Sequence, residues 1–155
     1  MHHAEMSARV PGWAIGELFD VLCSFESYPA HSEAVRRISV QRLDSGKVVS
    51  SWEVNFRRGV LRWTEEDTFD APNFSIEFRQ LEGDVDHFAG EWRVTEDEQG
   101  TTAHFAVDFD LGIPGLDHIL DPIAEQALFE NFQAILKGLV GQDIEEARLV
   151  SWATG

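Results

Sequence analysis

The chain has 155 residues, of which 28 are acidic and 12 are lysine or arginine, so its formal net charge is −16. A surface this acidic repels the phosphates of nucleic acids and the headgroups of anionic lipids, so we expect no nucleic-acid partner. Hydrophobic residues make up 43% of the chain, which is typical of a folded globular protein. No apolar run approaches the roughly 18 residues that cross a bilayer, so we expect no membrane span.

The cysteine content and the first residues indicate the compartment. Cys23 is the single cysteine of the sequence, which excludes an intrachain disulfide and fits a reducing environment. The opening MHHAEMSARV has neither a basic segment nor an apolar segment of the secretory type. We therefore expect a cytoplasmic protein, and the even composition predicts one domain over residues 1–155.

The first third of the chain indicates one short strand followed by helices. Residues 5–10 indicate a strand at the edge of a sheet. From Trp13 the apolar side chains recur every three or four residues, which predicts a helix. This helix should end before Tyr28, because the residue that precedes a proline disfavours helical geometry. Residues 30–34 indicate a second, short helical turn.

The middle of the chain alternates between apolar and polar residues and is broken by Gly, Pro, Asn and Asp. Alternation of this kind predicts strands that present one face to a core. The separations are short, so consecutive strands should pair as antiparallel hairpins. The predicted strands are residues 35–43, 47–57, 60–70, 74–82, 87–97 and 101–111.

The last segment with a clear pattern is a long amphipathic helix over residues 117–140. Asp117 is expected to cap its start, and Gly141 to end it. Residues 142–155 receive no assignment. Strands grouped together and followed by a helix favour an α+β fold. A curved antiparallel sheet wrapped around the long carboxy-terminal helix would bury the apolar stripe of that helix.

Four short segments, through their order and spacing, carry a resemblance over nearly the whole chain. They are Phe19-Asp20-Val21 through Ser27-Tyr28-Pro29, Leu61-Arg62-Trp63, Gly90-Glu91-Trp92-Arg93, and Asp108-Phe109-Asp110-Leu111 ahead of a helix with Leu128, Asn131 and Leu136. The chain resembles the START-like, or helix-grip (SRPBCC), superfamily of polyketide cyclases and aromatases, coenzyme Q-binding proteins and birch-pollen-allergen-like proteins. The resemblance implies a deep apolar cavity between sheet and helix that holds a hydrophobic small molecule.

Within this superfamily, the chain looks most like the single-domain aromatase/cyclases of bacterial aromatic polyketide pathways. Those proteins fold and dehydrate a poly-β-ketone delivered on an acyl carrier protein, in a cavity lined by aromatic residues and one arginine. Trp63 and Trp92 fall where the family carries cavity tryptophans, and Tyr28 falls where the family often has an aromatic residue before a proline. The chain departs from the family at two positions, because Asp67 replaces the cavity arginine and Val35 replaces a cavity tyrosine. The acid–base chemistry of that arginine and tyrosine is therefore not carried over.

The predicted strand 60–70 supplies a different pair of groups. Glu65 and Asp67 share the parity of Trp63, so both carboxylates point inward if Trp63 does. Buried carboxylates have raised pKa values, and two that lie close together cannot easily both ionise. Such a pair suits general acid and base catalysis. In the alternative interpretation the strand bulges or frays after Thr64, which leaves both acids in solvent or paired with arginines.

Further residues complete the predicted site. His31 follows Tyr28-Pro29 at the expected cavity entrance and is the histidine best placed for acid–base chemistry. Arg57, at a strand end beside a turn, should reach the mouth of the cavity. The predicted catalytic residues are Glu65, Asp67 and His31, and the predicted substrate-binding residues are Tyr28, Arg57, Trp63, Phe78, Trp92 and Asn131. No metal-ligand spacing of His or Cys occurs, and we expect no cofactor and no metal.

Three functions are compatible with these observations. The first is a polyketide cyclase or aromatase that promotes ring closure and dehydration, with an acyl carrier protein docking on a basic rim of Arg36, Arg37, Arg57 and Arg58. The second is a non-catalytic carrier of a lipid or quinone, similar to the coenzyme Q-binding branch. Inward carboxylates count against it, because an unused buried charge costs several kcal/mol. The third is a partner-binding or stress-associated module. The oligomeric state is left open.

Overall fold

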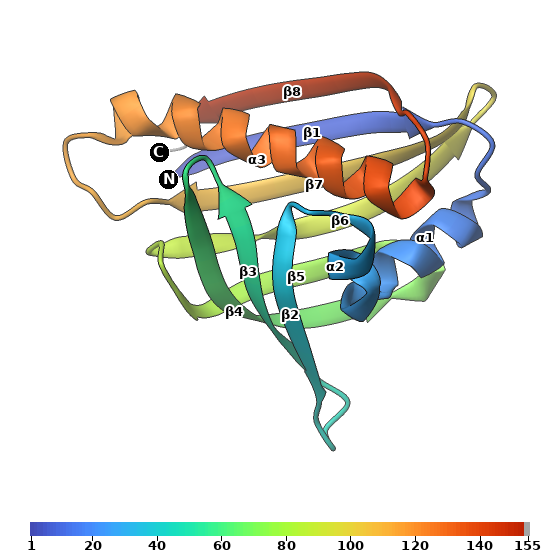
Figure 1. The fold of residues 1–155 in the computed structure, drawn as a ribbon, viewed down its shortest axis with the longest axis horizontal. Helices are drawn as coiled ribbons and strands as arrows, with labels where there is room; N and C mark the ends of the chain where they lie inside the picture. Colours follow the sequence, from blue (N-terminus) through green and yellow to red (C-terminus); the bar gives the residue numbers. More distant parts are fainter. Residues whose placement is uncertain (154–155) are drawn as a thin grey trace.

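The computed structural model describes residues 1–153, which form a strongly curved antiparallel sheet and three α-helices (Figure 1). The strands are β1 (His2–Val10), β2 (Val35–Arg42), β3 (Val48–Phe56), β4 (Gly59–Asp70), β5 (Ser75–Gly83), β6 (His87–Asp97), β7 (Gly100–Asp110) and β8 (Glu145–Ala153). The helices are α1 (Ile15–Cys23), α2 (Tyr28–His31) and α3 (Asp117–Val140), with 3-10 turns at Phe25–Ser27 and Ala71–Asn73.

The sheet has the strand order β2-β3-β4-β5-β6-β7-β1-β8. The six strands predicted in the middle of the chain form a continuous antiparallel meander, and each strand end lies within one residue of its predicted position. Helix α3 crosses the concave side of the sheet, while α1 and α2 cover one end of it (Figure 1). The predicted α+β helix-grip fold is therefore confirmed.

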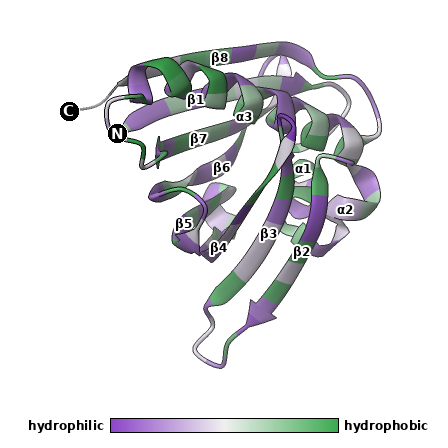
Figure 2. Cartoon of the chain, turned by 60° about the vertical axis from the view of Figure 1, so that its left-hand side comes forward, coloured by the Kyte–Doolittle hydropathy of each residue, from purple (hydrophilic) through white to green (hydrophobic). Residues whose placement is uncertain are grey.

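The sheet buries one face because its strands alternate. Along β3, the side chains of Ser50, Trp52 and Val54 are buried and those between them are partly exposed. The β3–β4 hairpin turns at Arg57, whose φ of 56° gives the left-handed geometry that a tight turn needs. This turn places Trp52 directly opposite Trp63 on β4. Hydrophobic and hydrophilic residues accordingly alternate along the strands (Figure 2).

The amino-terminal strand is not at the edge of the sheet, and the prediction for residues 5–10 is wrong in this respect. β1 begins at His2 and lies between β7 and β8. The strand that covers it, β8, comes from the carboxy-terminal residues that had received no assignment. The pairing joins the two ends of the chain, such as His2 with Ala153, so local pattern gives no signal for it.

The helices differ from their predicted bounds at three points. α1 ends at Cys23, before the position predicted from Tyr28, because Ser24 leaves helical geometry. The short helical turn is at Tyr28–His31 and not at 30–34, since a proline fits the first turn of a helix. Asp117 does not cap α3, because Leu116 occupies the N-cap position.

The carboxy-terminal end of the long helix matches its prediction. Gly141 ends α3 in the left-handed conformation, with a φ of 68°. Within the described part of the chain, no helix combines the length and the apolar character needed to cross a membrane.

A candidate ligand cavity lined by aromatic residues

A cavity of about 70 Å³ lies between the concave side of the sheet and α3. The sheet contributes Trp52, Val54, Leu61, Trp63, Glu65, Phe78, Phe88, Trp92 and Phe105, and the helical segments contribute Phe25, Tyr28, Leu128, Asn131, Phe132 and Ile135. Among these described lining residues, Glu65 is the only one with an ionisable carboxyl group, and none is basic. Ligand sites for small molecules typically measure about 300–1,000 Å³, so a large ligand has to displace side chains to enter.

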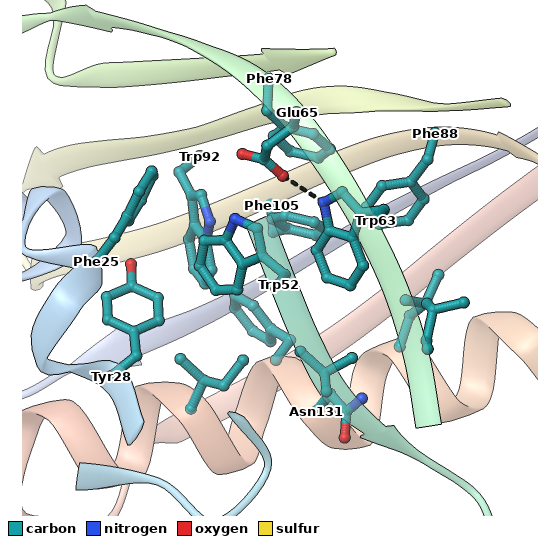
Figure 3. A pocket seen from close by; sticks show the side chains of 15 residues that line it. Phe25, Tyr28, Trp52, Trp63, Glu65, Phe78, Phe88, Trp92, Phe105 and Asn131 are labelled. Carbon is teal, nitrogen blue, oxygen red and sulfur yellow. Dashed lines mark hydrogen bonds between the residues drawn. The ribbon is translucent and has the colours of Figure 1, made fainter. Parts of the chain in front are cut away.

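Two stacked tryptophans form one wall of the cavity (Figure 3). The indole rings of Trp52 and Trp63 are almost parallel, at an interplanar angle of 3° and a centroid distance of 5.6 Å. Tyr28 and Phe25 contact Trp52 edge-on, with centroid distances of 5.5 and 5.2 Å. Offset stacks and edge contacts are the favoured arrangements of aromatic pairs. The wall therefore offers flat, apolar surfaces to a ligand.

A buried pair of carboxyl groups lies next to this wall. Glu65 and Asp67 are each only 3% exposed. Trp63 Nε1 donates a hydrogen bond to Glu65 Oε1 at 2.6 Å (Figure 3). Ser50 Oγ donates to Asp67 Oδ2 at 2.5 Å and accepts from Trp52 Nε1 at 2.8 Å. Each stacked indole is thus tied to one carboxyl group, directly or through Ser50.

Burial favours the neutral form of these acids. It raises the pKa of Glu65 well above its ordinary value, and the neighbouring Asp67 raises it further. Burial also raises the pKa of Asp67, although the neighbouring Glu65 carboxyl and the hydrogen bond from Ser50 oppose the change. Among the described residues, Asp67 Oδ1 is buried and has no hydrogen-bond partner. This oxygen is therefore a free acceptor beside the Glu65 carboxyl. The pair is therefore arranged to hold a proton inside an apolar cavity.

The register of β4 decides between the two interpretations of its acids. The pairing of β4 with β5 shifts between Thr64 and Glu65, but the extra residue is Leu81 of β5, so β4 itself continues without the bulge that the alternative required. The shift does not expose the acids, because Glu65 and Asp67 both remain in the core. In the part of the chain that is described, no group of three or more His, Cys, Asp or Glu side chains is placed to hold a metal ion.

The predicted site residues fall into three groups. Six of them line the cavity together, namely Tyr28, Trp63, Glu65, Phe78, Trp92 and Asn131. Asp67 is buried directly behind the lining and contacts it through Ser50. His31 is exposed at the end of α2 and does not line the cavity. Arg57 is exposed and does not line the cavity; it contacts α3 through Glu130 at 3.4 Å and the Ile123 carbonyl at 3.5 Å.

Two of the lining polar groups already have structural partners. The Tyr28 hydroxyl donates to the Leu22 carbonyl at 2.6 Å, which ties α2 to α1. Burial raises the pKa of Tyr28 well above its ordinary value, so this hydroxyl keeps its proton. Asn131 Nδ2 donates to the Asn55 carbonyl at 2.7 Å and so joins α3 to the end of β3. Glu65 is therefore the lining residue best suited to exchange a proton.

Sequence reasoning omitted Ser50 and Trp52 from the site. A signal for both was present, because a hairpin that turns near Arg58-Gly59 brings position 52 opposite Trp63 and position 50 opposite Glu65. The remaining omitted lining residues are apolar side chains, which sequence pattern does not separate from ordinary core. They are Phe25, Val54, Leu61, Phe88, Phe105, Leu128, Phe132 and Ile135.

Comparison with known families decides where the chain belongs. Residues 14–136 match the family described as polyketide cyclase/dehydrase and lipid transport. The chain is a member of this family. The resemblance inferred from its sequence motifs is thereby confirmed, and no curated protein sequence matches the chain.

Solved structures share the fold of this polyketide cyclase/dehydrase family member at low sequence identity. The TTHA0849 protein of Thermus thermophilus is 22% identical, with a TM-score of 0.78 over 90% of this chain and 94% of that one. The Zhui aromatase/cyclase of Streptomyces sp. R1128 is 21% identical, with a TM-score of 0.71 over 91% and 92%. A START superfamily protein from Mycobacterium smegmatis is 15% identical, with a TM-score of 0.77 over 91% and 98%. At these identities the likeness shows the fold.

Proposed function

We propose that this protein binds a poly-β-ketone intermediate in the cavity and promotes its ring closure and dehydration. The observation that carries the proposal is the Glu65 carboxyl, which lines a cavity made otherwise of aromatic and aliphatic side chains and one amide. Burial, as the larger cause, and the neighbouring Asp67 both raise its pKa, which favours the protonated acid. Active sites are where such perturbed acids are concentrated.

The carboxyl pair can serve both proton transfers of an aldol closure. A carbon–carbon bond forms between an enol carbon and a ketone carbonyl carbon of the same chain. The ketone oxygen takes the proton of Glu65, and the enol hydroxyl returns its own proton to the carboxylate pair. In dehydration, the new hydroxyl leaves as water with a proton from Glu65, and the adjacent C–H proton goes back to the pair. The acids end each step as they began it.

Enclosure contributes the remaining effect. A flexible poly-β-ketone held between the Trp52–Trp63 wall and Trp92 loses most of its alternative conformations, which favours one ring closure. For delivery, an acyl carrier protein is the proposed partner. Its docking rim is formed by the exposed Arg36, Arg37, Arg57 and Arg58, with Arg57 at the mouth beside α3.

The second candidate is a carrier of a neutral hydrophobic molecule such as a lipid or quinone. One observation favours it. Glu65 accepts a hydrogen bond from the Trp63 indole, and Asp67 is linked to the Trp52 indole through Ser50, so the pair already has a structural role. In that case Glu65 and Asp67 are structural acids. The family description, which includes lipid transport alongside cyclisation, supports this candidate as well.

Conservative replacements of the acids separate the two functions. With a synthetic poly-β-ketone thioester as substrate, Glu65→Gln and Asp67→Asn should each lower turnover about a hundredfold or more while ligand binding persists. Glu77→Gln, on the exposed side of β5, is the matched control and should leave turnover unchanged. Unchanged turnover in both site variants would contradict the catalytic proposal. A quinone or lipid that co-purifies in native mass spectrometry would favour the carrier.

A further inference from the structure

We propose that the cavity selects its ligand by charge, accepting a neutral planar ketone and rejecting an organic carboxylate of the same shape. The carboxyl pair of Glu65 and Asp67 is the selecting element. The inference deepens the proposed function and rests on it, because it names the ligand class of that cavity and the groups that set it.

The first argument is the absence of a cation to receive an anion. None of the described residues that line the cavity is Lys, Arg or His. Arg57, which is expected near the mouth, is exposed and already pairs with Glu130. An organic anion in the cavity would lose its hydration beside a buried carboxyl pair and gain no opposite charge, which is strongly unfavourable.

The second argument is the availability of a proton for a neutral acceptor. Trp63 Nε1 donates to Glu65 Oε1, so we expect the carboxyl proton on Oε2, where a ligand oxygen would compete with Asp67 for it. A ketone oxygen that reaches this group receives a hydrogen bond in an apolar environment, where such a bond is strong. A purely hydrocarbon ligand makes no use of it. The stacked indoles supply the flat surface on which the ring of an aromatic ketone packs.

An organic cation is the ligand that would compete most strongly with the proposed ketone for this cavity. The aromatic faces would attract it, and so would the pair if it were ionised. A carboxyl pair that keeps its proton carries less negative charge. Binding of a cation would therefore first require release of that proton to solvent. Comparing a ketone, a carboxylate and an ammonium on one ring system therefore reports the charge state of the pair directly.

The experiment uses three probes that share a naphthalene ring, 2-acetylnaphthalene, 2-naphthoate and 2-naphthylmethylammonium. They are titrated at pH 7 into the ¹⁵N-labelled protein, and the indole N–H resonances of Trp52 and Trp63 are followed. We expect the ketone to bind at least tenfold more tightly than 2-naphthoate and more tightly than the ammonium. Equal affinities for ketone and carboxylate would overturn the inference, and so would tightest binding of the ammonium.

A variant and a pH change test the role of the acids. The double variant Glu65→Gln/Asp67→Asn should bind 2-naphthoate at least threefold more tightly than the wild type does, while Glu77→Gln changes nothing. If the double variant fails to fold, the wild type decides, since lowering the pH toward 4 protonates 2-naphthoate and should bring its affinity toward that of the ketone. A 2-naphthoate affinity that stays the same in the variant, or across the pH change, overturns the inference.

Failure of this inference differs from failure of the proposed function. Ketone preference together with normal turnover in Glu65→Gln and Asp67→Asn would leave charge selection standing and end the catalytic proposal. Loss of turnover in those variants together with equal binding of all three probes would support the catalytic proposal and end charge selection.

Discussion

Three acidic residues in succession on β4, Glu65, Glu66 and Asp67, lie in two different environments. Glu66 is on the outer face, where it pairs with Arg79 at 3.3 Å and with Lys47 at 3.9 Å. Glu65 and Asp67 are in the core and are held by hydrogen bonds from a tryptophan and a serine. The pleat of the strand, and not the type of residue, decides whether an acid carries charge at the surface or is buried in the core.

The difference between the two faces is also energetic. An exposed ion pair contributes little to stability, because water and salt screen it. A buried carboxyl costs stability unless it keeps its proton and its hydrogen bonds. A chain with 28 acidic residues can place nearly all of them outside, so the two on the inner face of β4 call for a specific role. We attribute that role to the cavity that Glu65 lines.

We expect the largest loss of stability when a buried indole is removed from the inner face of the sheet. Trp52→Ala should lower the free energy of unfolding by about 3–5 kcal/mol, because it deletes a buried ring and leaves a cavity. Urea unfolding followed by circular dichroism measures the loss. The control is Glu53→Ala on the outer face of the same strand, where we expect a change below about 1 kcal/mol. Equal losses in the two variants would contradict the contrast between the faces.

The acid on the inner face should show itself in the pH dependence of stability. The folded pKa of Glu65 is raised above its ordinary value of 4.5, so the folded state keeps the proton longer than the unfolded state does. The unfolding free energy of the wild type, relative to that of Glu65→Gln, is therefore highest below pH 4.5. It falls as the pH rises, by about 1.4 kcal/mol per unit, until folded Glu65 ionises. Glu65→Gln should accordingly be more stable than the wild type at neutral pH.

Urea unfolding of both proteins at pH values from 4 to 8 checks this prediction. The difference in unfolding free energy should be small at pH 4 and should grow in favour of Glu65→Gln as the pH increases. Glu66→Gln provides the matched control on the outer face, and it should not show that growth. A difference that stays constant over the whole range would mean that Glu65 is ionised in the folded protein.

The local part of this fold could be predicted from the sequence. Alternating residues and turn signals are short-range features, and they located all six strands of the meander and the long helix α3. The pairing of β1 with β8 could not be predicted, because it depends on contacts between the two ends of the chain. The earlier end of α1 follows from the geometry of Ser24, which the proline rule at Tyr28 did not anticipate.

The site could be predicted where parity alone decides the direction of a side chain. Trp63, Glu65 and Asp67 point inward because they share one face of a strand. His31 was predicted at the cavity entrance from its nearness in sequence to Tyr28, but it is exposed at the end of α2 and does not line the cavity, so its acid–base role stays a prediction. Predicting the hydrogen bond from Ser50 to Asp67 requires the register of β3 against β4. That register follows from the sequence only if the exact residues of the turn are known.

Removing the link between an indole and an acid should have a smaller effect. Ser50→Ala leaves Trp52 Nε1 without its acceptor and Asp67 Oδ2 without its donor. We expect a loss of about 1–2 kcal/mol in unfolding free energy and a shift of the Trp52 indole N–H resonance. Ser39→Ala, at an exposed position of β2, is the control and should change neither quantity. An unshifted Trp52 resonance would show that Ser50 does not hold the indole.

The smallest effect belongs to the outer face. Glu66→Gln removes the carboxylate that pairs with Arg79 and Lys47, both of which are largely exposed. We expect a loss below about 1 kcal/mol, which should shrink further in roughly 0.5 M salt because exposed charges are screened. Unfolding measured at low and high salt tests this expectation. A large loss that does not respond to salt would mean that Glu66 is as deeply engaged as its two neighbours, and the contrast between the faces of β4 would then fail.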